Sequence, residues 1–100
     1  HLETLVASHL LIWRDQSPDR ALHHWRSGSG QEADFVLEEG GSLLPLEIKA
    51  TAGIGTSDAR HLRAFLEHAA NAPRGIVLSS DPSIRVLAPR IIAAPWWAVV

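Results

Sequence analysis

The sequence predicts an α/β domain in which a helix is followed by three strands, a second helix and a further strand. Three observations predict this order. Apolar residues recur at helical spacing at the N-terminus and again in the second half of the chain. Two extended runs, 31–39 and 42–50, are separated by Gly40-Gly41, which suits a tight hairpin turn. The apolar run at 75–78 indicates a buried strand.

The first helix begins at residue 2 and is bounded by Pro18. One face of this helix carries residues at helical spacing: Leu2, Leu5, Val6, His9, Leu10 and Trp13. We therefore expect His9 to be a core histidine. Residues 21–27 are typical of a short strand, followed by a turn at 28–30.

Beyond the hairpin, a loop containing Gly53 and Gly55 precedes the second helix, which Thr56 or Ser57 is expected to cap. The apolar side of this helix carries Ala59, Leu62, Phe65, Leu66 and Ala69. The helix ends at 71–73, before the buried strand. The last predicted elements are two short edge strands and a tail whose rings pack on the body: residues 84–87, residues 90–94 and Pro95-Trp96-Trp97.

Composition narrows the function classes. The chain has 100 residues, 46% hydrophobic and 20% charged, and a net charge of −2, which favours one folded domain over a disordered chain or a strongly basic nucleic-acid-binding domain. Cysteine is absent, so disulfides, thiolate metal sites and cysteine nucleophiles are excluded. No apolar run approaches a membrane span and no signal peptide is evident, so we expect a cytoplasmic location. The start at His1, directly before a helical pattern, indicates a domain cut from a longer protein.

The two-residue turn fixes which residues of the hairpin face each other. It places Asp34 across from Glu47 and Glu32 across from Lys49, the single lysine of the chain. One face of the hairpin is then apolar and carries Phe35, Leu37, Leu44, Leu46 and Ile48. The other face is charged and carries Glu32, Asp34, Glu38, Glu47 and Lys49.

Opposed carboxylates repel by about 3 kcal/mol at roughly 5 Å and an effective dielectric constant near 20. A divalent cation between Asp34 and Glu47 would turn this repulsion into binding, and oxygen ligands select Mg²⁺ or Mn²⁺. Lys49 would then reach a metal-bound phosphate or water. The alternative is a solvated hairpin face, with an ordinary ion pair between Glu32 and Lys49. A one-residue register slip would also remove the opposition of the two acids.

Asp34 followed by Glu47-Ile48-Lys49 resembles the PD-(D/E)xK signature of restriction-endonuclease-like phosphodiesterases. The resemblance implies an αβββαβ core with a mixed sheet flanked by two helices. It also implies that Asp34 and Glu47 are metal ligands and catalytic together with Lys49, and that Glu3 of the first helix is a further acid at the metal. Ala33 stands where the signature has proline.

A longer ordered set of segments is similar to an uncharacterised domain found at the C-terminus of many bacterial and archaeal AAA-type ATPases. These segments are 2–3, 24–26, 32–37, 46–50, 62–65, 75–78 and 95–97. The resemblance implies an N-terminal P-loop ATPase domain as partner, and the chain itself has no phosphate-binding loop motif. DNA is a further possible partner, bound weakly by the isolated domain because its net charge is negative. The rival function is a catalytically silent interaction or regulatory module of the ATPase.

The histidines, two arginines of the second helix and three tryptophans are further candidates for binding, and each also has a purely structural interpretation. His23 and His24 are neighbours on a strand, so they point to opposite faces and do not chelate together. His61 and His68, seven residues apart on a helix, either form a shared ligand site or are solvated. Arg60 and Arg63 either contact phosphate or form a solvated helix face with Glu67. The rings of Trp25, Trp96 and Trp97 either stack on bases or pack internally.

Overall fold

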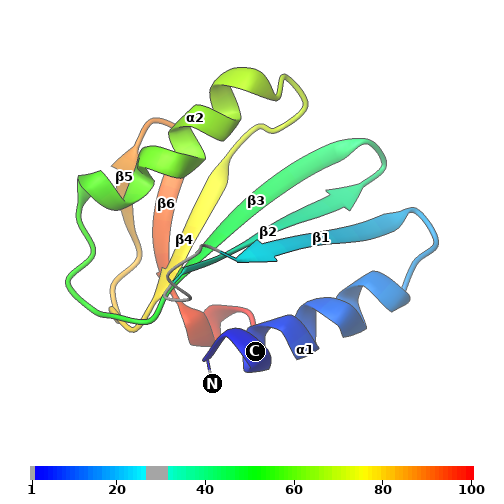
Figure 1. The fold of residues 1–100 in the computed structure, drawn as a ribbon, viewed down its shortest axis with the longest axis horizontal. Helices are drawn as coiled ribbons and strands as arrows, with labels where there is room; N and C mark the ends of the chain where they lie inside the picture. The colour runs from blue at the N-terminus through cyan, green and yellow to red at the C-terminus, as the bar shows by residue number, and fades with distance from the viewer. Residues whose placement is uncertain (1, 27–31) are drawn as a thin grey trace.

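The computed structural model describes residues 2–26 and 32–100 and has a mixed α/β fold, in which one helix lies on each face of a six-stranded sheet (Figure 1). No described helix is long and apolar enough to cross a membrane. The elements in chain order are α1 (Leu2–Asp15), β1 (Arg20–Arg26), β2 (Glu32–Glu39), β3 (Ser42–Lys49), the 3₁₀ helix η1 (Thr56–Ala59), α2 (Arg60–His68), β4 (Gly75–Ser79), β5 (Arg85–Ala88), β6 (Ile91–Pro95) and the 3₁₀ helix η2 (Trp96–Ala98).

The sheet has the strand order β1-β2-β3-β4-β6-β5. The first three strands are antiparallel, β4 is parallel to β3 and to β6, and β5 is antiparallel to β6. The predicted order of helix, three strands, helix and strand is confirmed. The prediction that 84–87 and 90–94 both form edge strands is wrong for the second, since β6 lies inside the sheet. Ile91 and Ala93 are fully buried there, which an interior strand requires and an edge strand does not. The turn predicted at 28–30 lies outside the described residues.

The central hairpin has the predicted turn and register. Gly40 and Gly41 have φ values of 57° and 85°, the left-handed backbone that a two-residue hairpin turn needs at both positions. Glu39 pairs with Ser42, and the ladder continues without a bulge to Glu32 and Lys49. Glycine suits this turn because it lacks the Cβ that opposes left-handed backbone. The hairpin therefore fixes which side chains share a face.

The apolar face of the hairpin packs on α1, below the sheet in Figure 1. The core on this side contains Val6, Leu10, Phe35, Leu46, Ile48, Leu78 and Ala94. The apolar face of the first helix is narrower than predicted, because Leu5 is 40% exposed and His9 is exposed. The expectation of a core histidine at position 9 is therefore wrong. The buried stripe runs through Val6 and Leu10 and is rotated toward Ala7, so residues 5 and 9 face away from the sheet.

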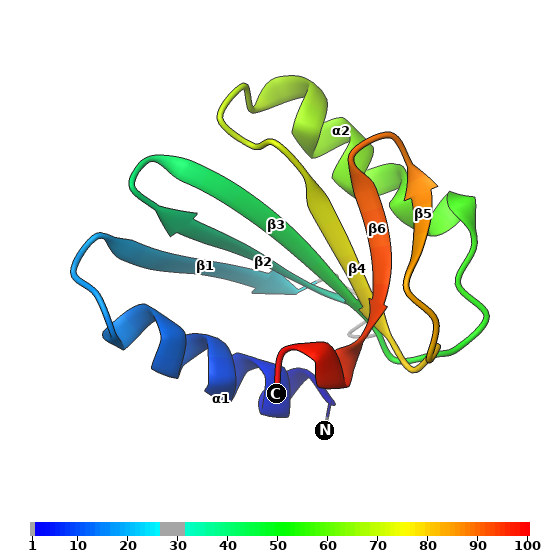
Figure 2. The ribbon, with the colours of Figure 1, turned by 180° about the vertical axis from the view of Figure 1, so that it is seen from behind.

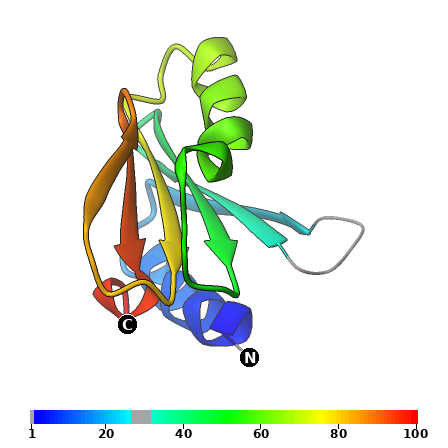
Figure 3. The ribbon, with the colours of Figure 1, turned by 90° about the vertical axis from the view of Figure 1, so that its left-hand side faces the viewer.

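The second helix covers the opposite face of the sheet; in Figure 3 it lies at the top of the view and α1 at the bottom, with the strands between them. Leu62 and Leu66 of α2 pack on Val77 of β4 and Ala93 of β6. Neither Thr56 nor Ser57 caps the segment, so that prediction is wrong. The start of η1 is instead closed by the Asp58 carboxylate, which accepts a hydrogen bond of 2.8 Å from the Gly55 N–H. An acidic residue three positions into a helix reaches back in this way to a backbone donor that lacks a helical partner.

The C-terminal tail returns to the first helix. Figure 2 shows η2 beside α1, with both chain ends at the same side of the molecule. Trp96 packs against the core that includes Val6, as predicted, and its ring meets Trp97 edge-on at 5.4 Å between centroids. Trp97 itself is 45% exposed. The expected packing of both rings on the body therefore holds fully only for Trp96.

Candidate metal centre on the central hairpin

Asp34 and Glu47 lie directly across from each other on β2 and β3, as the sequence predicts. Both side chains belong to the hairpin face that α2 covers, and both line the same pocket. Glu47 has no solvent exposure, so this face is more than a solvated surface. A buried carboxylate is costly unless it is paired, because low-dielectric surroundings disfavour the charged form.

Lys49 supplies a compensating charge to this carboxylate. The Lys49 Nζ atom lies 2.8 Å from Glu47 Oε2 and 3.8 Å from Asp58 Oδ1, and the lysine side chain is only 13% exposed. The backbone register places Glu32 across from Lys49 as predicted, but the Glu32 side chain lies outside the described part of the chain. Among the described residues, the Lys49 ammonium group instead contacts Glu47 on the same strand and Asp58 of η1. The lysine thus sits between a buried acid and a second acid from η1.

The second oxygen of Glu47 faces α2. His61 Nδ1 lies 3.6 Å from Glu47 Oε1, and the His61 side chain is 54% exposed. This histidine opens onto a pocket of about 340 Å³ between α2 and the hairpin, whose walls are mostly apolar. The pocket is lined by Asp34, Phe35, Val36, Pro45, Leu46, Glu47, His61, Leu62, Ala64, Phe65 and His68. An acidic centre in an apolar wall strengthens electrostatic interactions with a bound cation.

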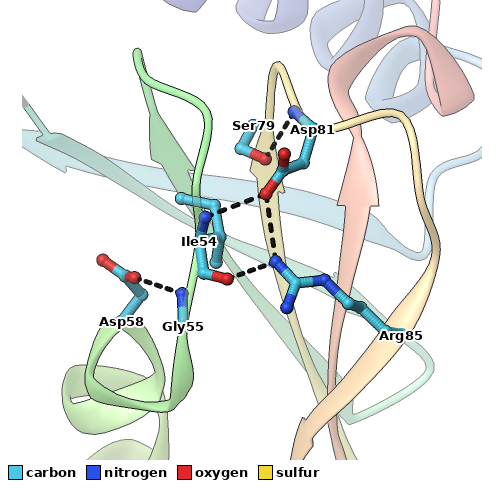
Figure 4. Close-up of polar contacts among 6 residues, drawn as sticks. All are labelled: Ile54, Gly55, Asp58, Ser79, Asp81 and Arg85. Carbon is cyan, nitrogen blue, oxygen red and sulfur yellow. Dashed lines mark hydrogen bonds and ion pairs between the residues drawn. The ribbon is translucent and has the colours of Figure 1, made fainter.

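The loop after Lys49 is held by a polar cluster between β3 and β5 (Figure 4). Asp81 Oδ2 accepts hydrogen bonds from the Ile54 N–H at 2.8 Å and from Arg85 Nη2 at 3.0 Å, and Arg85 also donates to the Ile54 carbonyl. The Asp81 N–H in turn donates to Ser79 Oγ at 3.1 Å. The backbone donors of Ile54 and Gly53, with Arg85, hold the pKa of Asp81 below its usual value. This cluster anchors the segment that leads to Asp58.

Glu3 lies on the other side of the sheet, in α1. Glu3 Oε2 is 3.0 Å from His24 Nε2, and the His24 ring stacks on Phe35 with centroids 4.4 Å apart. Phe35 belongs to the core between the sheet and α1, whereas Asp34 and Glu47 line the pocket beneath α2. Within residues 2–26 and 32–100, no three His, Asp or Glu side chains gather closely enough to hold a metal ion as they stand. The role of Glu3 as a metal ligand stays a prediction.

The remaining candidates are spread over the surface. His23 pairs with Glu38 at 3.1 Å while His24 turns to Glu3, so the two neighbouring histidines do point to opposite faces. Arg60 and Arg63 are exposed and line a shallow surface hollow with Thr56, Ser57, Ala64 and Glu67. These positions fit the predicted solvated helix face and leave the phosphate contact a prediction.

Two residues beside the Glu47–Lys49 pair, Asp58 and His61, are not among the predicted site residues. Asp58 follows Gly55 by three positions, a spacing that marks helix starts and could have identified it as the residue that caps η1. For His61 the sequence indicates only a possible shared site with His68 on the same helix. Nothing in the sequence links His61 to Glu47, since the two meet only because α2 crosses over the hairpin.

Residues 1–98 match the family described as Domain of unknown function (DUF4143). The chain therefore belongs to the DUF4143 family. The match spans nearly all of the DUF4143 fold described above, including the hairpin with Asp34, Glu47 and Lys49. No curated protein and no solved structure matches this DUF4143 chain.

Proposed function

We propose that this DUF4143 domain is a metal-dependent phosphodiesterase of the PD-(D/E)xK type that cleaves nucleic acid. One observation carries the proposal. Glu47 is fully buried, lies in register with Asp34, and has Lys49 Nζ at 2.8 Å. Opposed acids at the floor of a pocket cost free energy in a purely structural hairpin, since like charges across a strand pair are destabilising. A bound cation would offset that cost.

The donor set suits a hard divalent ion. Asp34 and Glu47 offer carboxylate oxygens of the kind that hold Mg²⁺ or Mn²⁺. When bound, such an ion supplies Lewis-acid polarisation of a phosphoryl oxygen and a lowered pKa of its water. Lys49 would place its ammonium beside a substrate phosphate and stabilise the negative charge that grows on it. Asp58 and the anchored loop before it would keep the lysine on this side of the sheet.

The fold and the family match are compatible with this proposal. The first helix, the three antiparallel strands, the second helix and β4 follow the αβββαβ order of the restriction-endonuclease-like core. The DUF4143 match is compatible with a C-terminal domain of a prokaryotic AAA-type ATPase. We infer that the ATPase domain is the partner that brings substrate to the site. The net charge of −2 leaves the isolated domain with weak affinity for DNA.

A nicking assay tests the chemistry. Supercoiled plasmid is incubated with the domain in Mn²⁺ or Mg²⁺, and nicked product is measured for the wild type and for Lys49→Ala and Asp34→Asn. We expect the wild type to nick the plasmid and both variants to lose activity. Asp15→Asn is the matched control, because this acid is exposed at the end of α1 and, among the described residues, pairs with its neighbour Arg14. Equal nicking by wild type and Lys49→Ala would show that the activity comes from elsewhere.

A catalytically silent interaction module is the second candidate, and two observations favour it. Glu47 and Lys49 already form an ion pair within the protein, and the described acids and histidines do not gather into a three-residue metal site as they stand. A buried ion pair of this kind also stabilises the fold of a protein that catalyses no reaction. The hairpin and α2 would then serve to contact the ATPase domain or another partner.

Thermal unfolding with and without Mn²⁺ separates the two candidates. A cation at a hundredfold excess over its Kd adds about 2.7 kcal/mol to the stability of a protein with one site. For a domain of this size that gain raises Tm by roughly 10 °C or more. We expect this rise in the wild type and its loss in Asp34→Asn. An unchanged wild type, together with a more stable Asp34→Asn variant, would favour the silent module.

A further inference from the structure

We propose that His61 is a nitrogen ligand of this cation site and that the site prefers a transition-metal dication to Mg²⁺. The inference rests on the proposed function, because it extends the same metal centre. It starts from the position of His61 on the first turn of α2, where its ring reaches across the pocket to Glu47 on β3. The sequence signature places no residue from this helix at the metal.

The separation of the two groups is close to that of two ligands of one ion. His61 Nδ1 and Glu47 Oε1 are 3.6 Å apart, which is too long for a hydrogen bond. Ligand atoms lie about 2.1 Å from a small divalent ion, so two ligands of one ion are about 3.0–3.4 Å apart at angles of 90–109°. The observed pair is therefore within a few tenths of an ångström of a coordinating pair.

The third protein group is Asp34. It lies across from Glu47 in the ladder and lines the same pocket as His61. Because no three such groups are gathered in the described structure, binding of one ion by Asp34, Glu47 and His61 requires their side chains to move closer together. Lys49 stays on the other oxygen of Glu47, at 2.8 Å from Oε2, so it does not occupy the position between Oε1 and His61.

Nitrogen coordination changes which ion is preferred. Carboxylate oxygens bind Mg²⁺ and Mn²⁺ alike, whereas an imidazole nitrogen favours first-row transition-metal ions, Mn²⁺ included, over Mg²⁺. Replacing one oxygen ligand by an imidazole therefore raises the affinity for Mn²⁺ relative to Mg²⁺. His61 is 54% exposed, so its removal opens no buried cavity and its variants are expected to fold.

Manganese binding tests the inference directly. Electron paramagnetic resonance of free Mn²⁺ gives the Kd, and competition with Mg²⁺ gives the preference between the two ions. We expect His61→Ala to weaken Mn²⁺ binding about 10–100-fold while Mg²⁺ binding changes little. Electron spin echo modulation should detect nitrogen coupled to Mn²⁺ in the wild type, change when the histidines carry ¹⁵N, and vanish in His61→Ala.

His68→Ala is the matched control. This residue lies on the same side of α2 and lines the same pocket, but its Nδ1 is 2.9 Å from the Ala64 carbonyl oxygen, at the far end of the helix. Its removal should leave both the Kd and the nitrogen coupling unchanged.

The outcomes separate this inference from the proposed function. Mn²⁺ binding that needs Asp34 but is insensitive to His61→Ala, with no nitrogen coupling, would overturn the inference and leave the metal centre in place. A wild-type domain that binds no Mn²⁺ would overturn the metal centre itself.

Discussion

Replacing Lys49 with methionine removes an ammonium group that lies 2.8 Å from a fully buried carboxylate. Methionine keeps the length and apolar stem of the side chain, so the change acts mainly on charge. At this separation and an effective dielectric constant near 20, the gross attraction is about 6 kcal/mol. Part of this is returned when the lysine is no longer desolvated, and removing one partner of a buried pair costs about 3–5 kcal/mol.

A loss of this size is large for a domain of 100 residues, whose total stability is about 5–15 kcal/mol. A decrease of about 3 kcal/mol lowers Tm by roughly 12 °C or more. Thermal and urea unfolding of Lys49→Met should show this decrease. Glu47→Gln combined with Lys49→Met should recover much of the lost stability, because the double variant no longer buries the Glu47 carboxylate without its partner ammonium group.

Arg14→Met provides the comparison. Arg14 pairs with Asp15 at 2.9 Å, but the two side chains are 41% and 69% exposed. An exposed pair of this kind contributes about 0–1 kcal/mol. If Lys49→Met shifts Tm by no more than Arg14→Met does, or if the double-mutant cycle gives a coupling energy near zero, the buried ion pair does not stabilise the fold.

Four further substitutions test the structure around the site. Asp81→Asn should destabilise the fold more at pH 7 than at pH 3. The pKa of Asp81 is lowered in the folded state, so the stabilisation from its carboxylate is present above about pH 4 and is lost as the pH falls through the folded-state pKa. Equal losses of stability in urea unfolding at both pH values would contradict the prediction. Gly40→Ala should lower the stability by about 1 kcal/mol, because the φ of Gly40 is 57°. Gly55→Ala should lower it clearly less in the same assay, because the φ of Gly55 is −128° and nothing lies within 4 Å of an added Cβ. The reverse order would argue against a left-handed turn at Gly40. Leu78→Ala should cost about 2–5 kcal/mol, since this side chain is 1% exposed between the sheet and α1, and a loss below about 1 kcal/mol would mean that the core closes around the cavity.

The hairpin was predictable because everything that defines it is local. Two glycines set the turn, and the alternation of apolar and charged residues on both sides sets the register. A slip of one residue would expose Phe35 and Leu46, which are 1% and 2% exposed. The pairing of Asp34 with Glu47 follows from the same local pattern.

The errors fall where position depends on packing between distant segments. Residues 90–94 look like a short strand at any place in a sheet, and only pairing with both β4 and β5 makes them interior. His9 satisfies the helical spacing of an apolar face, but the angle at which α1 meets the sheet leaves it exposed. Periodicity gives a face, whereas contact with another element decides how much of that face is buried.

By itself the sequence determined that two acids face each other on a glycine-closed hairpin with a lysine two residues beyond, because strand alternation and a two-residue turn leave one register. Tertiary structure alone decided that Glu47 is fully buried and that His61 and Asp58 lie beside its ion pair. The physical reason is the packing of α2: Leu62 and Leu66 bury their side chains against Val77, and this contact between segments far apart in the chain places the helix over the hairpin.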